Sequence, residues 1–84
     1  MGAKIKVYTT NYCPFCVAAK SLLKSKDLAF EEIKVDGDDE KRQWLVGVTG
    51  QRTVPQIFIN EKSIGGFQEL SELEESGKLD ELVK

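Results

Sequence analysis

The first 35 residues follow a strand–helix–strand pattern, and this pattern restricts the chain to few folds. Residues 4–9 alternate, with Ile5 and Val7 on one face, which predicts a short strand. Residues 14–27 carry apolar side chains at helical spacing, and residues 30–35 predict a second strand. Two strands joined by a helix within about thirty residues form a βαβ unit. The two strands are therefore expected to be parallel, with a right-handed crossover.

A second helix is predicted after the βαβ unit. Asp38 or Asp39 can accept hydrogen bonds from the first free backbone N–H groups of a helix over residues 40–48. Gly50 lies near the end expected for this helix. The residues that this helix would bury are Trp44, Leu45 and Val48.

The last third of the chain predicts two more strands and a final helical region. A strand over residues 56–59 and a short strand around residues 63–64 are joined by a hairpin loop. Gly65-Gly66 then precedes a helix over residues 67–76, and one or two helical turns are expected in residues 78–84. This order predicts an α/β fold with a mixed four-stranded sheet in the order 2-1-3-4 and helices on both faces.

The composition indicates one small globular domain over residues 1–84. Apolar residues make up 40% of the chain and charged residues 31%, which argues against disorder. The net charge of -2 gives no support for nucleic-acid binding. No apolar run is long enough to cross a bilayer, and residues 1–6 lack the apolar core of a signal peptide. We therefore expect a cytoplasmic protein that binds no membrane and holds no stable structural disulfide.

Cys13 and Cys16 stand where the first predicted strand passes into the first helix. A Cys-x-x-Cys pair beside a βαβ pattern is a signature of thioredoxin-like redox proteins. If the helix begins at Pro14, Cys13 is its N-cap residue, where free N–H groups and the helix dipole stabilise a thiolate and lower its pKa. Cys16 would lie one turn further in, more buried and less acidic. We therefore expect Cys13 to be the attacking thiolate and Cys16 the resolving thiol.

Two other interpretations of the cysteines stay open. Free cysteine packs as a small apolar side chain, so both residues could simply be buried. They could also form half of a metal site that is shared between two molecules. The chain has no histidine, which excludes a Cys/His zinc site and a Cys–His nucleophile pair.

Three motifs together closely resemble those of the dithiol glutaredoxins. They are Cys13-Pro14-Phe15-Cys16 after the first strand, Thr53-Val54-Pro55 before the third strand, and Gly65-Gly66 before the last main helix. The resemblance covers essentially the whole chain. The family usually has Tyr where this chain has Phe15, a change that keeps the aromatic face and loses a hydroxyl.

This resemblance implies a thioredoxin fold and a glutathione-dependent thiol–disulfide oxidoreductase. Cys13 would attack proteins that carry disulfides or glutathionylated thiols, and glutathione, as reductant and co-substrate, would regenerate the enzyme. The resemblance also implies a cis peptide bond between Val54 and Pro55. We expect a monomer without a metal cofactor.

The resemblance places a glutathione-binding groove beside Cys13. The residues expected to line it are Phe15, Arg52, Thr53, Val54, Pro55, Gly66, Phe67 and Gln68. The Val54 backbone would bind the cysteinyl part of glutathione as an added strand does. Free N–H groups at Gly66 and Phe67 would bind the γ-glutamyl carboxylate.

Two positions depart from the family pattern. Many relatives have Lys where this chain has Thr10, and either Gln51 or, better, Arg52 could replace its contact with the glycine carboxylate. Relatives also often have Asp where this chain has Gln68, which can accept a hydrogen bond but carries no charge. Arg52 and Gln68 could instead be ordinary solvated surface residues, and this is the interpretation that we adopt for Glu69.

Two alternative functions stay open as well. The departures at Thr10 and Gln68 motivate the first alternative, a redoxin that takes electrons from a thioredoxin reductase. A thiolate at an exposed helix end could also bridge an iron–sulfur cluster between two subunits, through Cys13 and glutathione. Pro14 argues against this second alternative, because family members that hold clusters usually lack proline there.

Overall fold

A four-stranded sheet forms the centre of the computed structural model, which describes residues 3–83. Its strand order is β2-β1-β3-β4, as the sequence predicted. The elements in chain order are β1 (Ile5–Thr9), α1 (Pro14–Ser25), β2 (Glu31–Lys34), α2 (Asp39–Thr49), β3 (Gln56–Ile59), β4 (Lys62–Gly65), α3 (Phe67–Ser76) and α4 (Lys78–Leu82). Each lies close to its predicted bounds. The last helical region was predicted to reach Lys84, which lies outside the described residues.

β1 has a neighbour on each side, and the two neighbours run in opposite directions. It is parallel to β2, with Lys6 opposite Glu31, and antiparallel to β3, with Val7 opposite Ile57. β4 then returns antiparallel to β3. The parallel pair belongs to the βαβ unit, and the β3–β4 pair is a hairpin, because a short loop can join only antiparallel neighbours. This is the mixed sheet that the order of elements predicted.

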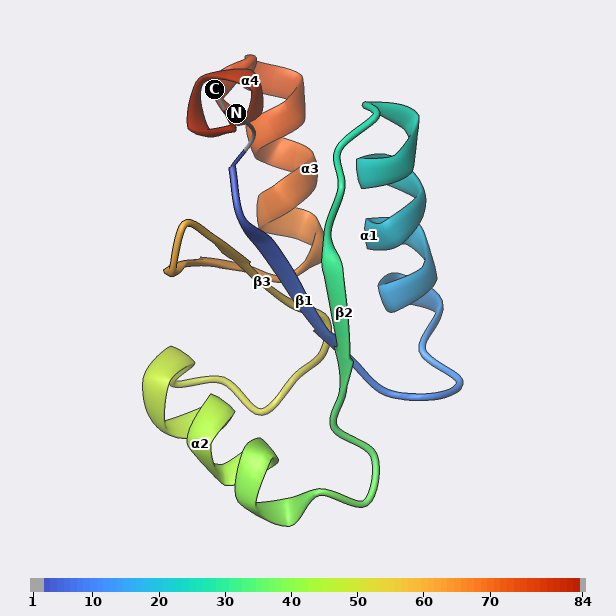
Figure 1. The fold of residues 1–84 in the computed structure, drawn as a ribbon, viewed down its shortest axis with the longest axis vertical. Coiled ribbons are helices and arrows are strands. Elements are labelled where there is room, and N and C mark those ends of the chain that lie inside the picture. The colour runs from blue at the N-terminus through green and yellow to red at the C-terminus, as the bar shows by residue number, and fades with distance from the viewer. Residues whose placement is uncertain (1–2, 84) are drawn as a thin grey trace.

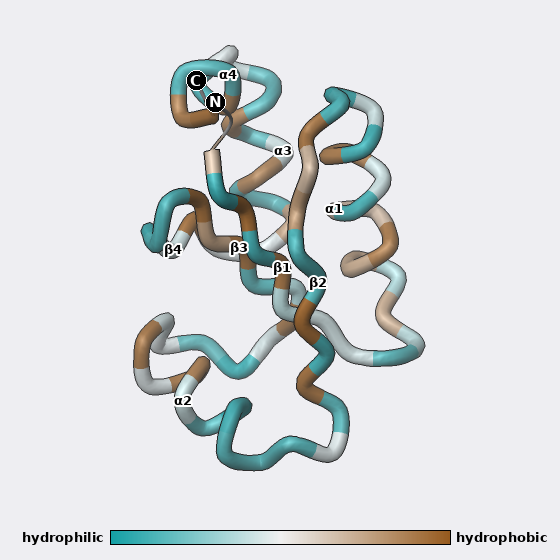
Figure 2. Tube along the Cα trace, viewed as in Figure 1, coloured by the Kyte–Doolittle hydropathy of each residue, from teal (hydrophilic) through white to brown (hydrophobic). Residues whose placement is uncertain are grey.

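Two apolar clusters cover the two faces of the sheet. The larger one consists of Ile5, Val7, Ala19, Leu23, Ile57, Ile59, Leu70 and Leu79. The smaller one consists of Tyr8, Val35 and Leu45. Val7 and Tyr8 are neighbours in β1 and therefore point to opposite faces, one toward α1 and α3 and the other toward α2. Figure 1 shows α1 beside α3 and α2 standing apart from them. Hydrophobic and hydrophilic residues alternate along the elements that carry these clusters (Figure 2).

The outer side of α2 corrects one sequence prediction. Leu45 is buried, as expected, but Trp44 and Val48 are 49% and 50% exposed. The Trp44 ring stacks on Phe58 with a centroid distance of 6.2 Å and tilts against Tyr8 at 5.7 Å, so the sheet covers only part of the indole. The prediction of burial was wrong for Trp44 and Val48, because helical spacing identifies an apolar stripe but not its width.

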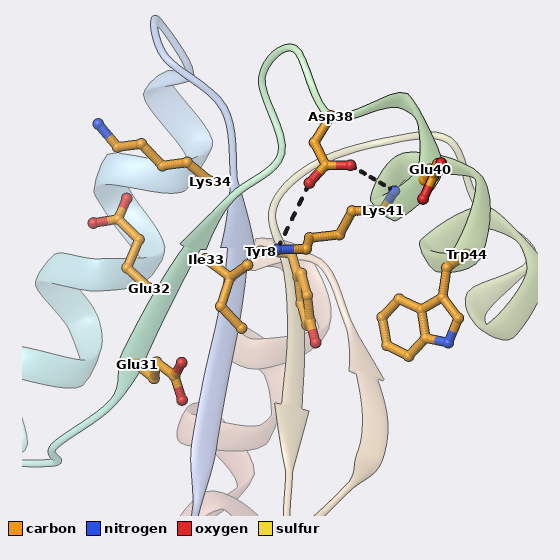
Figure 3. Close-up of a pocket in the computed structure, with 9 residues that line it drawn as sticks. All are labelled: Tyr8, Glu31, Glu32, Ile33, Lys34, Asp38, Glu40, Lys41 and Trp44. Atoms are coloured by element: carbon orange, nitrogen blue, oxygen red, sulfur yellow. Dashed lines mark hydrogen bonds and ion pairs between the residues drawn. The ribbon is translucent and has the colours of Figure 1, made fainter.

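The predicted cap of α2 is present. The Asp38 side chain accepts a hydrogen bond from the Lys41 N–H at 3.0 Å, which satisfies one of the free donors at the start of the helix. Figure 3 shows this contact beside the ion pair between the Asp38 carboxylate and the Lys41 ammonium.

Of residues 3–83, no helix combines the length and the apolar character needed to cross a membrane.

Candidate active site

Cys13 is the N-cap residue of α1, as predicted. Its backbone is extended, with φ -114° and ψ 101°, and Pro14 begins the helix. The Cys13 Sγ accepts a hydrogen bond from the Cys16 N–H at 3.1 Å. The Cys16 N–H is free to donate, because the first N–H groups of a helix have no partner within the helix. A hydrogen bond that the sulfur accepts favours a negative charge on it.

Cys16 lies one turn into α1 and is only 2% exposed, which confirms its predicted burial. Burial, followed by the hydrogen bond with Cys13, raises the pKa of the Cys16 thiol to about 12. Cys16 therefore holds its proton at neutral pH. The Cys13 side chain, unlike that of Cys16, is partly accessible to solvent. Both cysteines are free thiols.

The second motif lies against the first. The peptide bond between Val54 and Pro55 is cis, which confirms the prediction made from the family resemblance. The Val54 carbonyl oxygen lies 3.7 Å from the Cys13 Sγ, a distance at which a thiol can donate a weak hydrogen bond. The loop before β3 thus reaches the reactive end of α1.

The third motif lies against the second, through Gly66 and Pro55. A Cβ placed on Gly66 would lie 3.3 Å from the Pro55 carbonyl oxygen, so the absence of a side chain at Gly66 lets the two segments approach. The Gly66 N–H donates to the Glu69 carboxylate at 2.7 Å. This N–H is therefore not free, contrary to the expectation for a glutathione carboxylate. Glu69 was predicted to be a solvated surface residue, and this was wrong, since it binds the start of α3.

Phe15 and Phe67 form the aromatic side of the site. Their ring centroids are 6.2 Å apart with an interplanar angle of 30°. Phe15 is 64% exposed, so it belongs to the surface beside Cys13 and not to the core. This contact joins the first turn of α1 to the first turn of α3.

Arg52 and Gln68 are both exposed. Arg52 is exposed and, with Arg42 and Val46 of α2, lines a hollow of about 440 Å³. The Gln68 side chain is exposed and donates to Glu72 within α3 at 3.4 Å. The structure therefore brings the cysteines, the Thr53–Pro55 segment and the two phenylalanines together. It leaves Arg52 exposed beside α2 and pairs Gln68 with Glu72.

Two further residues support the site without a role that the sequence predicted. The Asp36 carboxylate, just after β2, accepts from the Asn11 N–H through both oxygens, at 3.0 and 2.8 Å. This holds the loop that presents the fully exposed Tyr12, whose φ is 57°, next to Cys13. Gln56, completely buried at the start of β3, binds the loop before Pro55. The sequence held one signal for each role. Asp36 is an acidic residue directly after a strand, and Gln56 is a polar residue at the start of a buried strand.

An ion pair lies one turn beyond Cys16. Lys20 of α1 contacts the Glu32 carboxylate at 2.9 Å, and the buried Thr9 hydroxyl donates to the same carboxylate at 2.8 Å. The bond from Lys20, followed by that from Thr9, lowers the pKa of Glu32. The Lys20 charge also opposes the rise in the pKa of Cys16.

A wide hollow of about 740 Å³ lies away from the cysteines. Figure 3 shows it between β2 and the start of α2. Its charged lining residues are Glu31, Glu32, Lys34, Asp38, Glu40 and Lys41. Because it includes neither cysteine and carries both signs of charge, it is separate from the candidate active site.

Comparisons with known proteins agree with this geometry. The glutaredoxin family model matches residues 5–64. The chain is 49% identical over 82 residues to a probable glutaredoxin of Synechocystis sp., covering 96% of this chain and 75% of that protein. It is 44% identical over 82 residues to glutaredoxin 3 of Escherichia coli, covering 98% and 99% of the two chains.

Solved structures of glutaredoxins have the same fold. A wheat glutaredoxin superposes with a TM-score of 0.89 at 40% identity, covering 96% of this chain and 78% of that chain. A buckwheat glutaredoxin, solved as a complex with glutathione, superposes with a TM-score of 0.91 at 32% identity, covering 96% and 76%. The sheet order and flanking helices are thus those of the thioredoxin fold, as the resemblance implied.

Proposed function

Because the chain belongs to the glutaredoxin family of thiol–disulfide oxidoreductases, we propose that it reduces disulfides with electrons from glutathione. Its substrates are glutathione mixed disulfides and protein disulfides, and the reaction passes through the Cys13-Pro14-Phe15-Cys16 motif. The observation that carries this proposal is the position of the Cys13 Sγ, which accepts the Cys16 N–H at the start of α1 while Cys16 stays buried.

With a glutathione mixed disulfide, Cys13 acts alone. Its thiolate attacks the glutathionyl sulfur, so that a Cys13–glutathione disulfide forms and the bond to the substrate sulfur breaks. The substrate leaves as a thiolate and takes a proton from solvent. A second glutathione thiolate then attacks the glutathionyl sulfur, which releases oxidised glutathione and restores the Cys13 thiolate.

With a protein disulfide, both cysteines take part. Cys13 first forms a mixed disulfide with the protein, and Cys16 then loses its proton and attacks the Cys13 sulfur. This step releases the reduced protein and leaves a Cys13–Cys16 disulfide, which two molecules of glutathione reduce. Because burial raises the pKa of Cys16, its deprotonation limits the resolving step at neutral pH.

The glutathione site is proposed along the groove beside Cys13. A related buckwheat glutaredoxin was solved as a glutathione complex, and this chain has the same fold. The residues proposed to line the site are Phe15, Arg52, Thr53, Val54, Pro55, Gly66, Phe67 and Gln68. The Val54 backbone takes the cysteinyl part of glutathione, in the manner of an added strand. Gln68 reaches glutathione only after leaving Glu72, and the exposed Arg52 side chain turns toward a glutathione carboxylate, so both side chains are expected to adjust on binding.

The choice of reductant tests this proposal. The oxidised protein is offered glutathione with glutathione reductase and NADPH, or a thioredoxin reductase with NADPH, and NADPH consumption is followed. We expect rapid reduction by the glutathione system. Rapid reduction by the thioredoxin reductase alone would instead assign the protein to the reductase-fed redoxins.

A further inference from the structure

Gln56 directly follows Pro55, and its side chain is completely buried. Its Nε2 group donates to the Gln51 side-chain oxygen and to the Thr53 carbonyl oxygen, both at 2.9 Å, with the Thr53 hydroxyl at 3.4 Å. Its Oε1 atom is also buried and has no partner among residues 3–83. The Gln56 amide therefore ties the loop of residues 51–53 to the sheet through its Nε2 end alone.

Packing of the core does not explain an amide at this position. An unpartnered buried acceptor lowers stability, and an apolar side chain of similar length would fill the space without that cost. Gln51 and Thr53 are exposed, so water could satisfy their oxygen atoms in the absence of Gln56. What the Gln56 amide adds is one fixed arrangement of the loop.

The bond from Gln56 to the Thr53 carbonyl also sets the direction of the Val54 N–H. These two groups belong to one planar trans peptide unit, so they point to opposite sides of the chain. Among residues 3–83, the Val54 N–H donates to no protein acceptor. The Val54 carbonyl oxygen lies 3.7 Å from the Cys13 Sγ. An unpaired donor is thereby held in a fixed direction next to the reactive thiol.

We propose that Gln56 is a positioning residue for glutathione transfer, whose amide holds the Val54 N–H in the direction that binds the glutathionyl group attacked by Cys13. This inference rests on the proposed function and gives Gln56 no direct contact with glutathione. In the step concerned, a Cys13–glutathione disulfide forms, the substrate–glutathione bond breaks, and the substrate thiolate takes a proton from solvent. Loss of the Gln56 donor leaves this chemistry intact and weakens the hold on the glutathionyl group.

The test compares two proteins that both carry Cys16→Ser, one with Gln56→Met and one without it. Two probes are used, and both release the same peptide. One probe is a cysteine-containing peptide that carries a glutathionyl group. The other is the same peptide with 2-mercaptoethanol in place of glutathione, which has no carbonyl oxygen to accept a hydrogen bond from the Val54 N–H. Transfer to Cys13 is measured by mass spectrometry after acid quenching, and thermal unfolding is followed by circular dichroism. Methionine keeps the side-chain length and removes both Nε2 and the unpartnered oxygen.

We expect glutathionyl transfer to slow by about three- to tenfold, the effect of one net hydrogen bond. Transfer of the 2-mercaptoethanol group should keep its rate, and the unfolding midpoint should not fall. Equal slowing with both probes, or no slowing with glutathione, would overturn the proposal. If Gln56→Met does not fold, Gln56→Leu replaces it with the same expected results. If the Cys16→Ser parent shows no preference for the glutathionyl probe, the proposed function itself fails, whatever Gln56 does.

Discussion

The Cys13 sulfur lies 3.7 Å from the carbonyl oxygen of Val54, a residue 41 positions later in the chain. This contact joins the start of α1 to the loop before β3. The same loop carries Pro55, whose carbonyl oxygen lies against Gly66 at the start of α3. Three short motifs that are far apart in the sequence are therefore joined by contacts that begin at the Cys13 sulfur.

The Phe15 ring is predicted to contribute to binding and not to folding. It is 64% exposed, so Phe15→Ala opens no cavity in the core and mainly removes an aromatic surface beside Cys13. We expect the KM for a glutathionylated peptide to rise roughly two- to tenfold, with little change in the unfolding midpoint. Phe15→Tyr keeps the ring and should behave as the unchanged protein. A large loss of stability in Phe15→Ala with an unchanged KM would contradict this role.

Asp36 is predicted to hold the loop that precedes Cys13. Asp36→Ala removes both hydrogen bonds to the Asn11 N–H, which should cost about 1 kcal/mol and lower the unfolding midpoint by about 4–8 °C. Hydrogen exchange of the Asn11 amide should become faster. Asp36→Asn is the matched control, because it keeps one acceptor oxygen and should lose less. Unchanged exchange at Asn11 in Asp36→Ala would show that the carboxylate does not hold the loop.

The resolving step is predicted to depend strongly on pH. Burial raises the pKa of Cys16 to about 12, so its thiolate fraction rises about tenfold for each pH unit through the neutral range. Release of glutathione from a Cys13–glutathione disulfide by Cys16 should accelerate by the same factor, and mass spectrometry can follow it. Cys16→Ser should show no such release. A rate independent of pH would contradict deprotonation as the limiting event.

The same shift has a consequence for stability. The folded thiol of Cys16 holds its proton more tightly than the unfolded thiol, whose ordinary pKa is 9.0. Its contribution is therefore fully present below about pH 9 and is lost as the pH rises toward 12. Denaturant titrations should show a free energy of unfolding that falls over this range, and Cys16→Ser should show a smaller fall.

The elements and their order could be predicted because local signals agreed with the fold. Alternation in β1, helical spacing in α1 and Pro14 in the first helical turn each point to the same structure. The position of Cys13 at the N-cap followed from Pro14 alone. The cis bond before Pro55 followed from the family resemblance, since propensity favours trans.

Contacts between distant residues could not be predicted in the same way. Trp44 matches the helical stripe of α2 but lies at its exposed margin, because its burial depends on how far the sheet extends. Glu69 is a different case, because it lies only three residues after Gly66 and its bond to the Gly66 N–H belongs to a local capping pattern of α3. Gln56 gains its role only when the loop before Pro55 folds back over β3. The exposure of Trp44 and the role of Gln56 depend on tertiary geometry that no local pattern encodes.

The central claim is that Cys13 alone carries glutathione transfer and that Cys16 serves only the dithiol reaction. The most direct measurement is reduction of a glutathionylated peptide by glutathione, with glutathione reductase and NADPH, for Cys13→Ser and Cys16→Ser side by side. The account predicts that Cys13→Ser loses the activity and that Cys16→Ser retains it. Full activity in Cys13→Ser would contradict the account.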